Sequence, residues 1–245
     1  MSRRRFLVPP EALRAEVVEL PPAEAAHARR VLRLGVGGEV WLLDGAGTLA
    51  RAELVEVGRR AVRARVLQRL QPEPPRPRLV LCLGLLKGPA MEQAVTKLTE
   101  LVVDELRPFT SSRSVPRLKD AAARLSRWRR LADQALKQCG AARPPRLFAP
   151  EPLDGLLPRA REGAARLLLY EGASRPTLAQ ALAGEAEAEE VWLVVGPEGG
   201  FAPSEVEAAR ELGFGVVGLG ETVLRAETAA VVGAGLVRFG AWPRA

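Results

Sequence analysis

The chain has 245 residues, with 36 basic and 29 acidic side chains, 47% hydrophobic residues and a formal net charge of +7. This length allows one large domain or a small domain joined to a medium one. The longest apolar runs, such as 79–83 and 191–195, are far shorter than the roughly 20 residues that span a bilayer. The basic start also lacks the long apolar stretch of a secretory signal. We therefore expect a cytoplasmic protein with no membrane partner.

The scarcity of histidine and cysteine narrows the possible chemistry. A Ser-His-Asp triad, or a zinc site of the histidine and cysteine kind, would have to use the single histidine, His27. We therefore predict no metal. Cys82 and Cys139 lie in an apparent strand and an apparent helix, which favours buried thiols over a disulfide.

Charge is unevenly distributed along the chain. Residues 1–72 carry 13 basic and 8 acidic side chains, residues 107–146 carry 11 and 2, and residues 147–245 carry 8 and 14. A basic first half beside an acidic last part indicates a polyanionic partner, with nucleic acid the leading choice. An arginine-rich solvated surface without a partner fits the composition equally well.

The pattern in the first part of the chain predicts short strands. Alternating segments at 39–43, 49–57 and 61–67, with turn residues between them, predict a small β-barrel. The segment 45–50 fits Gly-x-Gly-x-x-Ala, but it lies between two strands with no helix after it, which favours a hairpin turn. Four prolines within 71–77 indicate a linker. The predicted domains are therefore residues 1–72 and residues 73–245.

After the linker, strands and helices alternate. Apolar runs at 79–83, 105–108, 166–171, 191–195 and 216–219 predict strands, and helical spacing covers 90–103, 121–139, 177–182, about 204–213 and the stretch up to about 239. Strand-then-helix alternation predicts an α/β domain with a parallel sheet covered on both faces.

The sequence of two loops in this domain is typical of a ligand-binding site. The strand at 191–195 runs directly into Gly196-Pro-Glu-Gly-Gly200, and Ser204-Glu-Val-Glu207 has the capping-box pattern of a helix start. Glycines allow a ligand to approach backbone amides, and open α/β sheets bind ligands at the carboxyl ends of their strands. A simple chain reversal explains the glycine loop alone equally well.

The second loop, 220–228, follows the next strand, so we expect the two loops to form two walls of one pocket. Glu198, Arg225 and Glu227 would lie there among small and apolar residues, which requires ion pairs or a charged ligand.

These loops also carry a family resemblance. Gly196-Pro-Glu-Gly-Gly-Phe201, Leu219-Gly220 and Leu224-Arg-Ala-Glu-Thr-Ala229 closely resemble signatures of the SPOUT-superfamily methyltransferases that modify N3 of a uridine in 16S small-subunit ribosomal RNA. Further matches follow in the family's order over nearly the whole chain: Arg4-Arg5-Phe6, His27 with Val31-Leu-Arg33, Lys87, Lys97 with Glu100-Leu101, Ser112-Arg-Ser114, Arg127-Trp128 and Gln138-Cys-Gly140. One departure is that Ala141-Ala142 precede Arg143, where the family often continues directly with arginine.

The resemblance implies a PUA-like RNA-binding β-barrel followed by a SPOUT domain with a deep trefoil knot. It also implies a homodimer that acts on the 30S subunit and uses S-adenosylmethionine. Position-matching places the cofactor on Leu169, Glu171, Val195, Gly196, Pro197, Glu198, Gly199, Gly200, Leu219, Gly220, Thr222, Val223, Leu224, Arg225 and Thr228.

Charge type and loop position suggest the catalytic groups. Uridine N3 must lose its proton for methylation, so we assign Arg225 to stabilising the developing anion, and Glu198 or Glu227 to accepting the proton or orienting Arg225. The expected phosphate contacts are Arg3, Arg4, Arg5, Arg30, Arg33, Lys87, Arg113, Arg117, Arg124 and Arg127.

Two other functions remain open at this point. One is a non-catalytic RNA-binding factor for ribosome assembly, and the other is a SPOUT enzyme that acts on another RNA. The sequence leaves open the target nucleotide, the choice between naked RNA and assembled subunit, the identity of the proton acceptor, and how two protomers would share the RNA.

Overall fold

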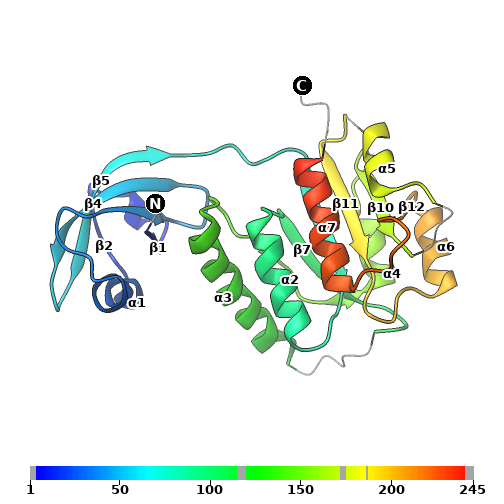
Figure 1. The fold of residues 1–245 in the computed structure, drawn as a ribbon, viewed down its shortest axis with the longest axis horizontal. Helices are drawn as coiled ribbons and strands as arrows, with labels where there is room; N and C mark the ends of the chain where they lie inside the picture. Colours follow the sequence, from blue (N-terminus) through cyan, green and yellow to red (C-terminus); the bar gives the residue numbers. More distant parts are fainter. Residues whose placement is uncertain (1–3, 115–119, 172–174, 186, 241–245) are drawn as a thin grey trace. The chain divides into compact units, whose positions relative to one another are not determined.

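A computed structural model of the chain describes residues 4–114, 120–171, 175–185 and 187–240 (Figure 1). The chain divides into two compact units. The first contains Met1–Glu73 and Asp133–Pro144, and the second contains Pro74–Ala132 and Pro145–Ala245. Within the described residues, no helix is long and apolar enough to cross a membrane.

The first unit is built on a five-stranded sheet in the order β1-β3-β4-β5-β2, in which β1 pairs parallel and the other pairs are antiparallel. Its strands are β1 (Arg5–Leu7), β2 (Val17–Glu19), β3 (Glu39–Leu43), β4 (Leu49–Val57) and β5 (Val62–Leu70). Its short helices are Ala12–Arg14, α1 (Pro22–Ala26) and the π-helix His27–Val31. Val62 and Ala64 are buried in its core while Arg63 and Arg65 are exposed, which confirms the predicted alternation.

The turn between β3 and β4 is held by one side chain. The carboxylate of Asp44 accepts hydrogen bonds from the backbone N–H groups of Ala46, Gly47 and Thr48, at 2.7, 2.9 and 2.8 Å. Because this is an Asx-type turn between antiparallel strands, the hairpin interpretation of 45–50 is confirmed.

A helix segment from far along the chain completes the first unit. The Nη1 group of Arg5 donates to the carbonyls of Lys137 and Gln138, at 3.0 and 2.7 Å. The ammonium of Lys137 pairs with Glu24 at 2.7 Å, and Arg143 donates to the carbonyl of Ala46. The helix α3 (Ala121–Cys139) therefore contributes its last turns to the first unit, which the sequence did not indicate.

The second unit is a parallel sheet in the order β12-β10-β11-β6-β7-β8, with β9 pairing β7. Its strands are β6 (Arg78–Gly84), β7 (Glu105–Thr110), β8 (Arg146–Leu147), β9 (Glu151–Pro152), β10 (Ala165–Leu169), β11 (Glu190–Val195) and β12 (Gly215–Val217). Besides α3, its helices are α2 (Pro89–Glu100), α4 (Leu153–Leu156), Leu157–Arg159, α5 (Leu178–Gly184), α6 (Pro203–Glu211) and α7 (Ala226–Phe239). These bounds confirm the predicted alternation of strands and helices.

Both faces of this sheet are covered, as the sequence predicts. Alternate strand residues such as Leu81 and Leu193 pack with α2, α5 and α7, and Figure 1 shows α2 and α7 side by side. The intervening residues, such as Cys82 and Val194, pack with α4 and α6 on the opposite face. Both cysteines are free thiols, with Cys82 buried and Cys139 half-buried. Burial raises the pKa of the Cys82 thiol.

Two helix starts differ from the sequence prediction. Helix α6 begins at Pro203 with Ala202 as its N-cap, so the proposed capping box at Ser204 is wrong. Ala202 has no side-chain oxygen, and only the Glu205 half of a capping box is present, with its carboxylate accepting from the N–H of Ala202 at 2.8 Å. Helix α7 begins at Ala226, so Glu227 belongs to its first turn and not to the preceding loop.

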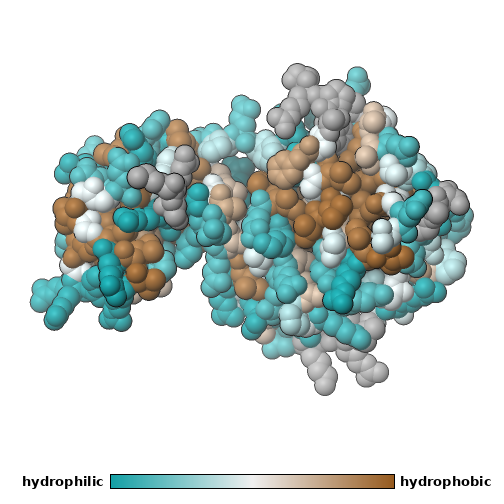
Figure 2. Space-filling view, in the orientation of Figure 1, coloured by the Kyte–Doolittle hydropathy of each residue, from teal (hydrophilic) through white to brown (hydrophobic). Residues whose placement is uncertain are grey.

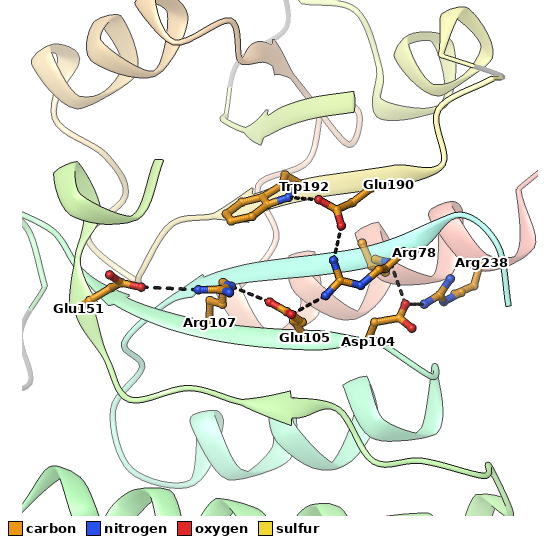
Figure 3. Close-up of polar contacts among 9 residues, drawn as sticks. Arg78, Asp104, Glu105, Arg107, Glu151, Glu190, Trp192 and Arg238 are labelled. Carbon is orange, nitrogen blue, oxygen red and sulfur yellow. Dashed lines mark hydrogen bonds and ion pairs between the residues drawn. The ribbon is translucent and has the colours of Figure 1, made fainter. Parts of the chain in front are cut away.

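Charged side chains are linked at the amino ends of the central strands (Figure 3). Arg78 at the start of β6 bonds both Glu190 of β11 and Glu105 of β7, and Arg107 donates to Glu105 at 2.7 Å. The indole N–H of Trp192 donates to Glu190 at 2.7 Å. This ionic network, which Glu151 extends, fixes the three central strands at the end opposite their carboxyl termini.

Candidate functional site

The carboxyl ends of β10, β11 and β12 open into one pocket. Its volume is about 610 Å³, within the roughly 300–1,000 Å³ common for small-molecule sites. Three segments supply most of its lining: 169–171 at the end of β10, 195–201 at the end of β11, and residues from 219 to 229 in the loop after β12 and the start of α7. Because β10 pairs with both β11 and β12, the three segments leave adjacent strands in the same direction. The two loops expected to form one pocket are thus brought together.

Glycines are required in the loop after β11, and beside it at the end of β6, because other backbone lies against them. A Cβ atom on Gly84, at the end of β6, would lie 2.3 Å from the nitrogen of Pro197. A Cβ atom on Gly199 would lie 2.7 Å from the carbonyl oxygen of Arg113. The Gly196–Gly200 loop, called the glycine loop below, is therefore held between the end of β6 and the segment after β7.

An aromatic pair anchors the end of the glycine loop. The rings of Phe201 and Phe109 stack with centroids 6.0 Å apart and an angle of 12° between their planes. Phe201 is buried, and its ring also closely approaches Gly196. The sequence did not single out this pair, because only the fold brings the end of β7 beside the residue that follows the glycine loop.

The pocket lining carries excess negative charge. Among the described residues, Glu171, Glu198, Glu221 and Glu227 line it together with one basic side chain, Arg225. This excess of carboxylates over guanidinium groups favours a ligand that carries positive charge.

The three predicted catalytic residues all line this pocket but differ in their contacts. One carboxylate oxygen of Glu198 accepts from the backbone N–H of Lys87 at 2.8 Å. Arg225 is the N-cap of α7 and is exposed, and within the described part of the chain neither its side chain nor that of Glu227 has a hydrogen bond or an ion pair. Arg225 and Glu227 are thus available to a ligand, whereas Glu198 already holds the segment after β6.

The predicted cofactor residues gather at this pocket with one exception. Thr228 is exposed in the first turn of α7 and does not line the pocket, whereas the other fourteen do. The lining also includes residues that were not among the predicted cofactor contacts: Ala90, Tyr170, Phe201, Glu221, Ala226 and Ala229. Tyr170 could have been inferred from its place between Leu169 and Glu171. Which lining residues contact a cofactor stays a prediction.

The predicted RNA contacts fall into two groups. Arg4, Arg30, Arg33, Lys87 and Arg113 are exposed and Arg124 is half-buried, so their charges reach the surface. Two others are engaged within the protein.

Arg5 donates to the last carbonyls of α3, and Arg127 forms a two-point ion pair with Glu92 at 2.6 and 2.8 Å. Arg5 therefore serves the fold in this structure. Arg3 and Arg117 lie outside the described residues.

Comparisons with known proteins give consistent matches along most of the chain. Residues 72–238 match the family model described as RNA methyltransferase domain, and residues 20–67 match the RNA methyltransferase PUA domain. Two curated relatives are both named ribosomal RNA small subunit methyltransferase E. The protein of Mycobacterium bovis is 38% identical over 226 residues, covering 87% of this chain and 83% of the relative. The protein of Synechocystis is 31% identical over 229 residues, covering 93% and 75%.

Solved structures show the same architecture. The ribosomal RNA small subunit methyltransferase E of Neisseria gonorrhoeae, bound to S-adenosyl methionine, aligns with a TM-score of 0.83 at 26% identity over 95% of each chain. A protein of Legionella pneumophila in complex with the same cofactor aligns with a TM-score of 0.82 at 27% identity over 97% of each chain. The predicted two-part fold, a PUA-like first domain and a parallel-sheet α/β domain, is confirmed, while the threading of a knot stays a prediction.

Proposed function

Because the chain belongs to the RNA methyltransferase family with an N-terminal PUA domain, we propose that it methylates N3 of one uridine in 16S ribosomal RNA. The methyl donor is S-adenosylmethionine, and the substrate is the assembled 30S subunit in the cytoplasm. The observation that carries the proposal is the pocket at the ends of β10, β11 and β12, two of whose three walls are the segments that match the family's signatures. The names of the relatives and the cofactor bound in the similar structures support it.

The residues present fit this cofactor. S-adenosylmethionine bears an ammonium and a sulfonium beside one carboxylate, and the carboxylates of Glu171, Glu198, Glu221 and Glu227 suit such a cationic group. The apolar lining, including Leu169, Val195 and Leu224, offers contact to its adenosine part. When bound, the cofactor supplies an electrophilic methyl group, so the protein need not provide a metal.

The remaining task of the protein is to make N3 of uridine nucleophilic. In the neutral ring the N3 lone pair is delocalised into two carbonyls, so the N3 proton must leave as the new bond forms. Glu227 is the better placed proton acceptor, because one oxygen of Glu198 is already held by the backbone of Lys87.

Arg225 balances the negative charge that this proton transfer leaves on the ring carbonyls. It stands at the N-terminus of α7, where the first backbone N–H groups add positive potential. A donor aimed at developing charge in this way is typically worth about 3–4 kcal/mol of transition-state stabilisation.

Substrate RNA would be held by phosphate contacts from both units. The exposed Arg4, Arg30 and Arg33 in the first unit, and Lys87, Arg113 and Arg124 in the second, are the groups that we assign to this role. Arg113 lies directly beside the glycine loop, where its Nη1 is 3.5 Å from the carbonyl of Gly199.

We also propose that the enzyme is a homodimer. Val223, Val232 and Phe239 are exposed by 72%, 38% and 72%, on the loop before α7 and on α7 itself. Figure 2 shows apolar side chains gathered on the second unit over α7. An exposed apolar surface of this kind favours association with a second copy.

The first experiment is methyl transfer from labelled S-adenosylmethionine to 30S subunits from cells that lack this enzyme, followed by mass mapping. We expect one N3-methyluridine, and weaker transfer to protein-free 16S RNA. Tight binding of cofactor and subunits without transfer would instead indicate an assembly factor, and a different methylated nucleotide would discard the assigned substrate while keeping the chemistry.

A further inference from the structure

Glu205, in the first turn of α6, bonds two backbone segments that are far apart in sequence. One carboxylate oxygen accepts from the N–H of Ser112 at 2.7 Å, and the other accepts from the N–H of Ala202 at 2.8 Å. Ser112 follows β7, whereas Ala202 directly follows the glycine loop and Phe201. A single half-buried carboxylate therefore joins the segments that leave β7 and β11.

The segment Ser111–Ser114, called the β7 loop below, lies against the glycine loop itself. The carbonyl of Arg113 occupies the space where a Cβ atom of Gly199 would be, and the Phe109–Phe201 stack joins the bases of the two loops. The two loops are therefore in contact both at their bases and at Gly199.

Among the described residues, the β7 loop borders a hollow on one side. A second cavity of about 360 Å³ lies there, lined by hydroxyl-bearing residues of the loop and by Leu153, Leu157 and Glu205. Because the described residues leave this side hollow, the bonds to Glu205 and the contact with Gly199 help to determine where the loop sits. The hydroxyl of Ser114 accepts from the N–H of Ser111 at 2.8 Å, which keeps the loop a single turn.

We propose that Glu205 is a positioning residue that couples cofactor binding to RNA binding. This inference rests on the proposed function, in which the glycine loop holds the cofactor and Arg113 of the β7 loop contacts a phosphate. A cofactor that orders the glycine loop also orders the β7 loop through Glu205, so each ligand strengthens the binding of the other. Such coupling is reciprocal by thermodynamic necessity, and values of about 5–150-fold are typical.

Three variants separate this role from a general loss of structure. Glu205→Ala removes both bonds, whereas Glu205→Gln keeps one acceptor oxygen but turns an NH2 group towards the second backbone N–H. The matched control is Glu207→Gln on the same helix. Its side chain is 62% exposed and pairs only with Arg210, at 2.9 Å, among the residues described.

The test is the affinity of the protein for 30S subunits with and without saturating S-adenosylhomocysteine, a product that permits no turnover. We expect the wild type and Glu207→Gln to bind subunits about tenfold more tightly with the product present. Glu205→Ala should show less than a twofold effect and Glu205→Gln an intermediate one. Equal coupling in the wild type and in Glu205→Ala, or no coupling in the wild type, would overturn the proposal.

Amide hydrogen exchange is a second measurement, and it tests the two hydrogen bonds to Glu205 directly. In the free protein, amide hydrogen exchange at Ser112 and Ala202 should be faster in both Glu205 variants than in the wild type. If Glu205→Ala instead weakened product binding more than tenfold without RNA, Glu205 would serve the glycine loop alone and the coupling role would be discarded. A failure of the proposed function is distinguishable, since the wild type would then transfer no methyl group to subunits at all.

Discussion

At the scale of single residues, Arg225 tests the proposed chemistry most directly. Its side chain is exposed at the pocket and, within the described part of the chain, is not bonded to protein, so its removal should not disturb the fold. We expect Arg225→Ala to lower the turnover number about 10²- to 10³-fold while the affinity for S-adenosylhomocysteine changes less than about threefold. Steady-state kinetics with 30S subunits and calorimetric titration of the product measure the two quantities.

The control for this variant is Arg161→Ala, an exposed arginine that does not line the pocket. It should leave both quantities unchanged. Reduced product affinity with an unchanged rate at saturation would remove Arg225 from the chemistry and leave it only the cofactor contact that the resemblance implies.

Gly84 tests how closely backbone packs beneath the pocket. A Cβ atom there would lie 2.3 Å from the Pro197 nitrogen, a backbone atom that can only move with the whole glycine loop. We expect Gly84→Ala to weaken S-adenosylhomocysteine binding about 5- to 150-fold, because overpacking of about 1–3 kcal/mol must be relieved by displacing that loop. Gly155→Ala is the matched control, since no atom other than its chain neighbours and the backbone of its own helix lies within 4 Å of its added methyl. Wild-type affinity in Gly84→Ala would show that the loop accommodates the methyl group without cost.

At the scale of elements, the ionic network is expected to stabilise the sheet. Burial disfavours the charge on Arg78, but hydrogen bonds and attraction from Glu190 and Glu105 outweigh this effect and raise its pKa. A basic group with a raised pKa keeps its stabilising contribution at all pH values below its unfolded pKa, so the network persists through neutral and mildly alkaline conditions.

The corresponding variant is Arg78→Met, which leaves the nearly buried Glu190 without its ion-pair partner and removes one of the partners of Glu105. We expect a loss of about 2–3 kcal/mol in the free energy of unfolding, measured with urea near neutral pH. The exposed pair Arg76–Glu189, with side chains 82% and 86% exposed, is the comparison. Arg76→Met should cost less than about 0.5 kcal/mol, and equal losses in the two variants would contradict a role for burial.

Elements with an uninterrupted apolar pattern were predictable to the residue. The strands Glu39–Leu43 and Leu49–Val57 and the helix Ala121–Cys139 have the bounds that alternation and helical spacing indicated. The starts of α6 and α7 could not be predicted from the sequence in the same way, because the first residue of a helix depends on which backbone groups find hydrogen-bond partners. At α6, Glu205 bonds Ala202 and so begins the helix before Ser204.

In the candidate site too, the sequence predicted the local segments but not the contacts between them. Its glycines and charged residues stand in two short segments, so the sequence alone placed Glu198, Arg225 and Glu227 at one pocket. The contacts between segments, such as Phe109 with Phe201 and Glu205 with Ser112, join residues about ninety positions apart. No local pattern signals such pairs, because they exist only after the parallel sheet has aligned the strand ends.

At the scale of the whole molecule, α3 is shared between the two compact units, so the first unit is incomplete as a continuous piece of chain. A fragment of residues 1–73 lacks the carbonyls that Arg5 binds and the ammonium that pairs with Glu24. We expect this fragment to unfold at lower urea than the same fragment mixed with a peptide of residues 121–146, with a midpoint that rises with peptide concentration.

The control peptide carries Lys137→Ala, which removes the ion pair with Glu24, and it should stabilise the fragment less. Circular dichroism follows the unfolding. A fragment whose stability does not respond to either peptide would show that residues 1–73 suffice as an independent domain.

The strands β6, β7 and β11 carry their ionic network at one end and lead to the pocket or its supporting loops at the other, about 20 Å away for six residues of strand. Substitutions that far apart, without shared partners, usually have additive effects. Substitutions in the loops that alter which RNA is methylated would therefore leave the contribution of the ionic network to the free energy of unfolding unchanged. Exchange of these loops can therefore give the protein a new RNA specificity, while the residues that stabilise the sheet stay the same.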